Sequence, residues 1–100
     1  MSQTVHALFP CQAGKGVELL AILRSEQGLP ATRAFEGCES IEAYTDADNP
    51  DNIVLWEKFA TRADHETYLA WRVETGLLDA LASILASDPE FTYLDIHPDV

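Results

Sequence analysis

One predicted helix face carries side chains that could move a proton and hold an anion. His65, Tyr68 and Arg72 follow one another at i, i+3 and i+7, a spacing that places them on the same side of a helix. Histidine titrates near neutral pH and can serve as a base. The guanidinium of arginine can neutralise a phenolate or a carboxylate. His65 and Arg72 are therefore the candidate catalytic residues.

Aromatic side chains close to that face could form the walls of a pocket. The helix must lie against the two strands predicted before it, at residues 38–45 and 53–60. Apolar and aromatic walls with a few polar groups are typical of sites for small molecules. The candidate substrate-binding residues lie on this helix or on those strands: Trp56, Tyr68, Trp71, Phe59, Tyr44 and Glu57.

Glu57 stands out because it shares a strand face with Ile53, Leu55 and Phe59. A buried carboxylate needs a partner, and we expect Arg33 or Arg72 to provide it. Glu57 is interpreted as a structural residue first and as a pocket-lining residue second.

A purely structural interpretation of the helix competes with the catalytic one. In that interpretation the aromatic residues form the packing face and Arg72 extends its charged end to solvent. His65 lies near the start of the helix, where a surface position is the alternative to catalysis. His6, in the middle of the first predicted strand, is a candidate for a contact between two copies of the chain.

The elements that position these residues follow from apolar periodicity and turn residues. Strands are expected at residues 3–10, 38–45, 53–60 and 90–97, and helices at 15–27, 29–34, 62–75 and 77–86. Gly28 is expected to end the first helix as its C-cap, and Thr61 to begin the third as its N-cap. The order β-α-β-β-α-β predicts an α+β, ferredoxin-like fold, a four-stranded antiparallel sheet with its helices on one face.

The opposite face of such a sheet is left without helices. His6 and Leu8, with Val54 and Trp56, make that face apolar enough to need cover. The same face of a second copy would supply it, so we expect a homodimer.

Length and charge limit the function classes. One hundred residues predict a single domain, 1–100. The 17 acidic residues against 6 basic ones give a net charge of −11, which repels nucleic acids and anionic membrane surfaces. No apolar run approaches the roughly 18–20 residues of a membrane span, and the N-terminus lacks the features of a signal peptide. With two cysteines expected to be reduced thiols, we expect a cytoplasmic protein.

Four segments in this order resemble the antibiotic biosynthesis monooxygenase (ABM) domain, a dimeric α/β barrel family. They are Thr32–Cys38 (TRAFEGC), Asp46–Pro50 (DADNP), Val54–Phe59 (VLWEKF) and the helix from Arg62 to Trp71. The resemblance implies a homodimer whose sheets pack face to face, with a pocket between sheet and helices in each subunit. Members of the family include cofactor-independent monooxygenases acting on phenols and quinols, heme-degrading enzymes and isomerase-like degraders of a signalling sugar, and some have no known reaction.

Heme degradation does not fit this sequence. The heme-degrading relatives resemble one another in an asparagine on the first strand, a tryptophan on the third and a histidine on a later helix. Here the first strand lacks asparagine, Phe59 stands in place of the tryptophan, and residues 77–86 contain no histidine. Tyr68 replaces the histidine that many small ABM proteins carry on the helix after the third strand.

The sequence therefore predicts a cofactor-independent monooxygenase that oxidises a small aromatic phenol or quinol with dioxygen. Nothing in it resembles a phosphate loop, a metal cluster or a dinucleotide-binding turn, so no cofactor is expected. Two alternatives stay open: a non-catalytic dimer that binds a small molecule, and an isomerase-type enzyme that degrades a small molecule.

Overall fold

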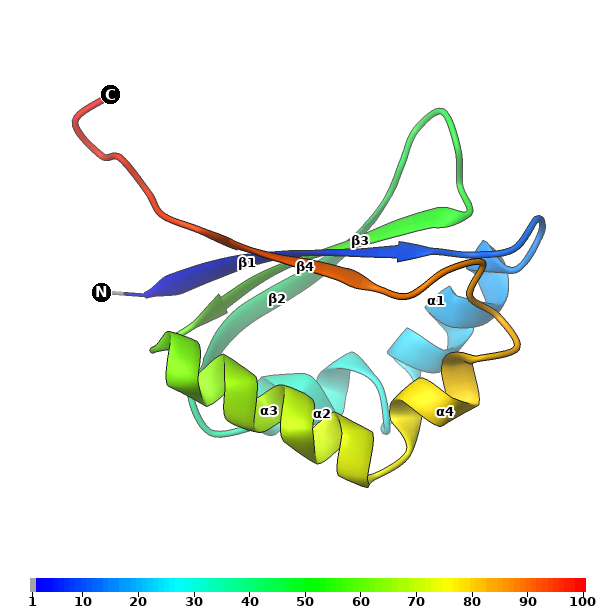
Figure 1. Ribbon diagram of the computed structural model, residues 1–100, viewed down its shortest axis with the longest axis horizontal. Helices are drawn as coiled ribbons and strands as arrows, with labels where there is room; N and C mark the ends of the chain where they lie inside the picture. The colour runs from blue at the N-terminus through cyan, green and yellow to red at the C-terminus, as the bar shows by residue number, and fades with distance from the viewer. Residues whose placement is uncertain (1) are drawn as a thin grey trace.

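The protein folds as one antiparallel sheet with all its helices against one face (Figure 1). This is a computed structural model, and it describes residues 2–100. The strands stand in the order β2-β3-β1-β4, and each neighbouring pair is antiparallel. The predicted α+β, ferredoxin-like fold is confirmed. The elements are β1 (Gln3–Pro10), α1 (Gly16–Arg24), α2 (Leu29–Ala34), β2 (Cys38–Thr45), β3 (Asn52–Phe59), α3 (Arg62–Glu74), α4 (Leu77–Leu81) and β4 (Glu90–Leu94).

The core lies between the sheet and the helices. Side chains alternate between the two faces of a strand, and the central strands β1 and β3 turn their apolar residues towards the helices. β1 and β3 pair with Ala7 opposite Leu55 and Phe9 opposite Ile53, and these four side chains are buried. The helices contribute the other half of this core with Leu19, Leu23, Leu29 and Leu81, and Ile84 adds to it from the turn after α4.

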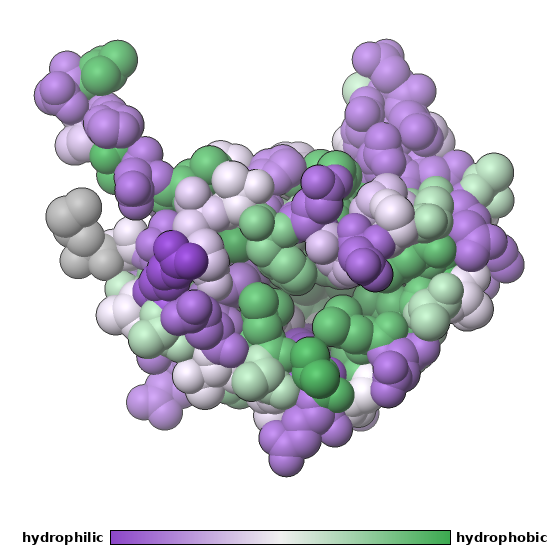
Figure 2. All heavy atoms as spheres, viewed as in Figure 1, coloured by the Kyte–Doolittle hydropathy of each residue, from purple (hydrophilic) through white to green (hydrophobic). Residues whose placement is uncertain are grey.

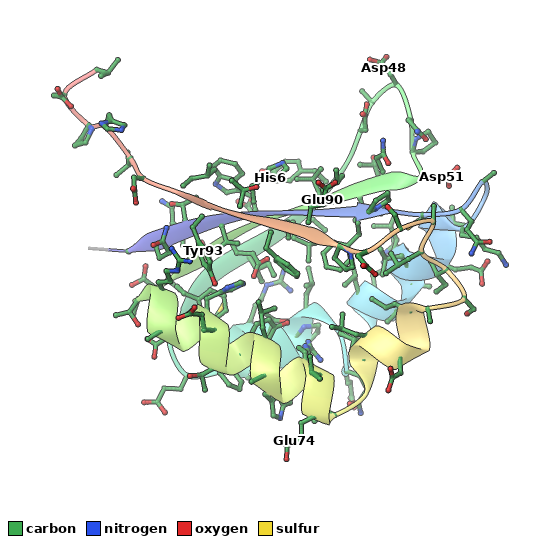
Figure 3. The ribbon with its side chains drawn as sticks, in the orientation of Figure 1. His6, Asp48, Asp51, Glu74, Glu90 and Tyr93 are labelled. Atoms are coloured by element: carbon green, nitrogen blue, oxygen red, sulfur yellow. The ribbon has the colours of Figure 1, made fainter. Side chains whose placement is uncertain are left out.

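The same alternation turns Trp56 and Tyr44 to the outer face of the sheet, where Figure 1 shows no helix. Trp56 is 38% exposed and Tyr44 is 51% exposed. His6 lies beside Trp56 with the ring centroids 6.2 Å apart, and Figure 3 shows it on the side of the sheet away from the helices. Because Glu57 faces the helices, Trp56 next to it must face away. The prediction that Trp56 and Tyr44 line the same pocket as Glu57 is therefore wrong.

Gly28 begins a helix instead of ending one. The first helix stops at Arg24, and Gly28 is the N-cap of α2, with its carbonyl accepting from the amides of Ala31 and Thr32. A Cβ at Gly28 would lie 2.4 Å from the carbonyl oxygens of Ile22 and Leu23. Glycine is required by this close backbone contact, which the C-cap prediction missed. α4 and β4 are also shorter than predicted, ending at Leu81 and Leu94.

A carboxylate joins the β2–β3 hairpin to the start of α1. Asp51 accepts hydrogen bonds from the amides of Gly14 at 3.0 Å and Gly16 at 2.9 Å. These bonds stabilise the charged form and lower the pKa of Asp51. The connection fixes one end of the helical layer against the sheet.

Within residues 2–100, no helix combines the length and the apolar character that crossing a membrane requires.

Candidate functional site

A small apolar cavity lies between the sheet and the helices. Its volume is about 40 Å³, room for a few water molecules. Figure 2 shows a hollow with a hydrophobic rim on this side of the molecule, between β4 and helices α3 and α4. Four polar side chains reach the cavity, which are Thr32, Glu57, Tyr68 and Arg72. The remaining walls are Phe9, Leu23, Leu29, Leu55, Leu69, Leu77, Leu78, Leu81 and Phe91.

The start of α3 is fixed by Thr61, whose hydroxyl accepts from the amide of Asp64 at 3.1 Å. This N-cap confirms the predicted helix start. It sets the rotation of the helix, so that His65, Tyr68 and Arg72 all turn inward and are buried. The alternatives of a surface position for His65 and a solvent-directed Arg72 are therefore wrong: His65 is 0% exposed and Arg72 is 5% exposed.

Arg72 ties α3 to the turn between α1 and α2. Its guanidinium donates to the carbonyls of Gln27 at 2.7 Å and Gly28 at 2.8 Å, to the Thr32 hydroxyl at 2.9 Å and to the Tyr68 hydroxyl at 2.8 Å. No carboxylate of residues 2–100 lies within ion-pair distance of it. The positive charge therefore sits at the cavity wall with neutral hydrogen-bond partners.

The hydroxyls of Tyr68 and Thr32 lie 2.7 Å apart, and either can donate. If Thr32 donates, Tyr68 accepts from both Thr32 and Arg72, and its own O–H is free to donate to a ligand in the cavity. Burial raises the pKa of Tyr68, although the hydrogen bonds from Thr32 and Arg72 act in the opposite direction. Tyr68 is therefore a protonated donor at neutral pH.

Glu57 faces the cavity from the sheet side, and the imidazole of His65 lies beside it. Glu57 is 2% exposed, and its Oε1 lies 3.5 Å from Nε2 of His65. Neither of these two atoms has a hydrogen-bond partner among the residues that the structure describes. The predicted partners were wrong, because Arg33 donates to the carbonyl of Ile41 and Arg72 donates to the groups given above. Glu57, in the cavity wall, thus meets His65 behind it, and the two facing atoms have no hydrogen-bond partner.

The other ring nitrogen of His65 reaches β4. Its Nδ1 lies 2.8 Å from the hydroxyl of Tyr93. The imidazole is enclosed by aromatic rings, with Phe59 at 5.0 Å, Tyr93 at 5.4 Å and Phe91 at 5.9 Å between centroids. Burial and the nearby Glu66 carboxylate raise the pKa of Tyr93. This enclosure fixes the orientation of the ring.

The structure thus brings Tyr68, Arg72 and Glu57 together around one cavity, and His65 lies behind Glu57, outside the cavity wall. Phe59 is fully buried behind it, packed on His65 and Tyr68. Trp71 packs against Phe35, with the ring centroids 5.3 Å apart, and is absent from the cavity wall.

Thr32 and Tyr93 were missed by the sequence prediction. No pattern in the sequence of β4 indicated the contact of Tyr93 with His65. Thr32 occupies a short helix whose contacts depend on the fold. Within the described part of the chain, no three or more His, Cys, Asp or Glu side chains are grouped closely enough to hold a metal ion.

The sequence profile of antibiotic biosynthesis monooxygenases matches residues 2–72, which include all four polar cavity residues. The chain belongs to this family. The match ends at Arg72, so α4 and β4 of this ABM protein, with Tyr93, lie outside it. No curated protein matches the chain.

Solved structures share the fold of this ABM protein over almost its whole length. An antibiotic biosynthesis monooxygenase superimposes with a TM-score of 0.81 at 20% identity, covering 96% of this chain and 99% of that one. Rv0793 from Mycobacterium tuberculosis is 25% identical, with a TM-score of 0.69 and coverage of 97% and 96%. A protein of unknown function from Nitrosomonas europaea has a TM-score of 0.79 at 20% identity, covering 95% and 88%.

Proposed function

We propose that this ABM protein is a cofactor-independent monooxygenase that oxidises a small phenol or quinol with dioxygen. One observation carries the proposal: an apolar cavity is lined on its sheet side by the buried carboxylate of Glu57 and on its helix side by Tyr68 and Arg72. These are the groups that oxygenation of a phenol without a cofactor requires, namely a base, a donor for the anion and walls that exclude water.

The reaction begins with loss of the substrate hydroxyl proton to Glu57. The resulting phenolate oxygen accepts a hydrogen bond from Tyr68 and is stabilised by the positive charge of Arg72. The electron-rich anion then reduces dioxygen and forms a C–O bond to it, giving a peroxide on the ring. Cleavage of the O–O bond leaves one oxygen atom on the ring as a quinone carbonyl, and the other leaves as water. The ring loses four electrons, and dioxygen gains them.

Substrate entry requires the cavity to widen. At about 40 Å³ it is smaller than an aromatic ring needs. Leu77 and Leu78 belong to the short helix α4, which follows Gly76 in the left-handed conformation at φ 84°. This helix is the wall that we expect to move when a ring enters.

The first prediction concerns Glu57. Replacing the carboxylate by an amide in Glu57→Gln removes the base while keeping the shape of the side chain. We expect the rate of oxygen uptake with a panel of quinols to fall by about 100-fold or more, the usual contribution of a general base. The measurement is an oxygen electrode trace for wild type and variant at the same protein concentration.

Glu74→Gln is the matched control, since the Glu74 side chain points away from the protein at the end of α3 (Figure 3). Its oxygen uptake should equal that of the wild type. A Glu57→Gln protein that consumes oxygen as fast as the wild type would remove Glu57 from the mechanism, and a wild type inactive on every quinol would oppose the proposal itself.

An isomerase-type reaction is the second candidate. It is favoured by the presence of proton-transfer groups on both walls, Glu57 on the sheet side and the Tyr68 hydroxyl on the helix side. A proton removed from one carbon could be returned to another without any oxidation. Deuterium entering a carbonyl substrate from heavy water, without oxygen uptake, would support this reaction instead.

A further inference from the structure

Three side chains from three different elements form a path from the cavity to the edge of the sheet. Glu57 on β3 lines the cavity, His65 on α3 lies 3.5 Å from it, and Tyr93 on β4 lies 2.8 Å from the far side of the imidazole. Each of these groups can both take up and release a proton.

The two ends of this path lie in different environments. Glu57 and His65 are almost completely buried, whereas Tyr93 is half-buried on β4, an edge strand of the sheet. Figure 3 shows Tyr93 between β4 and the first turns of α3, at the margin of the molecule. The guanidinium of Arg62 lies 4.0 Å above its ring and is itself on the surface. One end of the path is therefore in the cavity and the other is beside solvent.

A network that served packing alone would be expected to satisfy its polar atoms. Here Oε1 of Glu57 and Nε2 of His65 lie 3.5 Å apart, beyond an ordinary hydrogen bond. Leaving a buried polar atom without a partner is destabilising, and well-packed apolar side chains of similar volume would avoid that loss of stability. A long contact of this kind is instead typical of proton-transfer groups in a site without ligand, because such contacts shorten when a ligand binds.

We propose that Glu57, His65 and Tyr93 form a proton relay that connects the closed cavity with solvent. This inference rests on the proposed function, in which Glu57 is the base. The relay lets Glu57 exchange its proton with bulk water while the apolar mouth of the cavity is shut around a substrate. Tyr93 is a relay residue that acts through His65 and does not touch the substrate.

Each transfer along the relay is balanced. Protonated Glu57 gives its proton to Nε2 of His65, Nδ1–H passes its proton to the Tyr93 oxygen, and the Tyr93 O–H releases one to water. One proton leaves the cavity, no electron moves, and His65 changes from the Nδ1–H to the Nε2–H tautomer. The reverse sequence returns a proton to the cavity and restores the first tautomer.

The surroundings of Tyr93 favour the neutral form that the relay needs at its outer end. Arg62 and Glu66 on α3 face Tyr93 and pair with each other at 3.9 Å. Tyr93 has a raised pKa and so keeps its proton at neutral pH. Charges near the other end come from Glu57 itself and from Arg72 across the cavity.

The test uses Tyr93→Phe without substrate, because this variant removes only the hydroxyl. The rate at which the His65 ring proton exchanges with solvent is measured by ¹⁵N-edited NMR, together with the backbone amides of α3. If the relay exists, exchange of the ring proton slows by about tenfold or more, while the amides of α3 do not slow. If the hydrogen bond between His65 and Tyr93 is only structural, its loss should loosen the site and speed the exchange of the ring proton. Unchanged or faster exchange of the ring proton would overturn the relay.

Tyr44→Phe is the matched control, with the same chemical change on the exposed outer face. It should leave the exchange rate of His65 unchanged.

A second measurement needs no variant. In the wild type, urea below the unfolding transition should leave the exchange rate of the His65 ring unchanged if protons travel through Tyr93. A rate that rises with urea would show that exchange occurs by local unfolding, and the relay would be rejected.

The relay and the proposed function can fail separately. Oxygen uptake that depends on Glu57, combined with unaltered His65 exchange in Tyr93→Phe, would reject the relay and leave the monooxygenase. Slowed exchange combined with no oxygen uptake on any quinol would reject the monooxygenase and leave a relay that serves the isomerase-type reaction.

Discussion

Arg72 carries a buried positive charge whose partners are carbonyl and hydroxyl oxygens. Its planar guanidinium reaches four of them at once, from Gln27 to Tyr68. A lysine ammonium is a compact charge that cannot reproduce this geometry. Arg72→Lys should therefore lower the free energy of unfolding by about 2–4 kcal/mol, because several charge-assisted hydrogen bonds are lost and their acceptors stay buried.

Urea unfolding followed by tryptophan fluorescence gives this free energy. Arg24→Lys is the control, since Arg24 is exposed in the last turn of α1, and it should change the free energy by less than about 0.5 kcal/mol. If Arg72→Lys were as stable as the control, the hydrogen bonds of Arg72 would not hold α3 to the α1–α2 turn.

The orientation of a single residue was predictable where a periodic pattern determines which face of its helix or strand it occupies. The 3.6-residue repeat placed His65, Tyr68 and Arg72 on one face, and the two-residue repeat placed Glu57 inside. Neither repeat says which buried polar atoms meet. The partner of Glu57 comes from another element, through packing that brings α3 over β3, and so His65 could not be identified from the strand sequence.

At the level of elements, Asp51 connects the β2–β3 hairpin with the N-terminus of α1. Its pKa is lowered by the amides of Gly14 and Gly16. A lowered pKa means that the folded state favours the charged form, so this stabilisation is present above the unfolded pKa of Asp and is lost as the pH falls through the folded value. The effect therefore disappears in acid, below about pH 4.

Asp51→Asn should consequently lower Tm at pH 7, and the difference from the wild type should shrink as the pH is reduced towards 3. Thermal unfolding followed by circular dichroism across this range provides the measurement. Asp48→Asn, at the tip of the same hairpin (Figure 3), should keep the Tm of the wild type throughout. A Tm difference for Asp51→Asn that does not depend on pH would contradict the assigned cause.

Element order was predictable from sequence, whereas several element ends were not. The turn residues of Asp46–Asn52 and the Thr61 cap are local signals, and the hairpin and α3 follow them. Gly28 is different, because glycine after a helix can have either of two causes. The backbone can need a left-handed conformation, or a neighbouring group can leave no space for a side chain. The φ of Gly28 is −90°, and the reason is the close approach of the Ile22 and Leu23 carbonyls. Such a contact exists only once α1 and α2 have packed.

At the level of the whole molecule, the outer face of the sheet presents apolar side chains to solvent. Trp56, Tyr44 and Ile96 are 38%, 51% and 68% exposed, and Figure 1 shows all the helices on the opposite face. We expect two copies to pair through this surface, because a contiguous apolar patch is costly to leave hydrated. Trp56→Glu should therefore convert dimers into monomers.

Sedimentation velocity distinguishes the two masses. Val17→Glu makes the same kind of change on α1, where Val17 is 70% exposed, and it should sediment as the wild type does. A wild type that sediments as a monomer at high concentration would reject the pairing.

The positions of Glu57 and Arg72 also determine how a guest is oriented. A negative group on the sheet and a positive group on the helices face the same enclosed space, and an apolar interior screens their electric field weakly. In the proposed reaction, a molecule with unequal ends would therefore be aligned before any bond changes, with its electron-rich end towards α3 and its acidic hydrogen towards β3. Selectivity among isomers of equal size would then depend on their dipole moments as well as on their shapes.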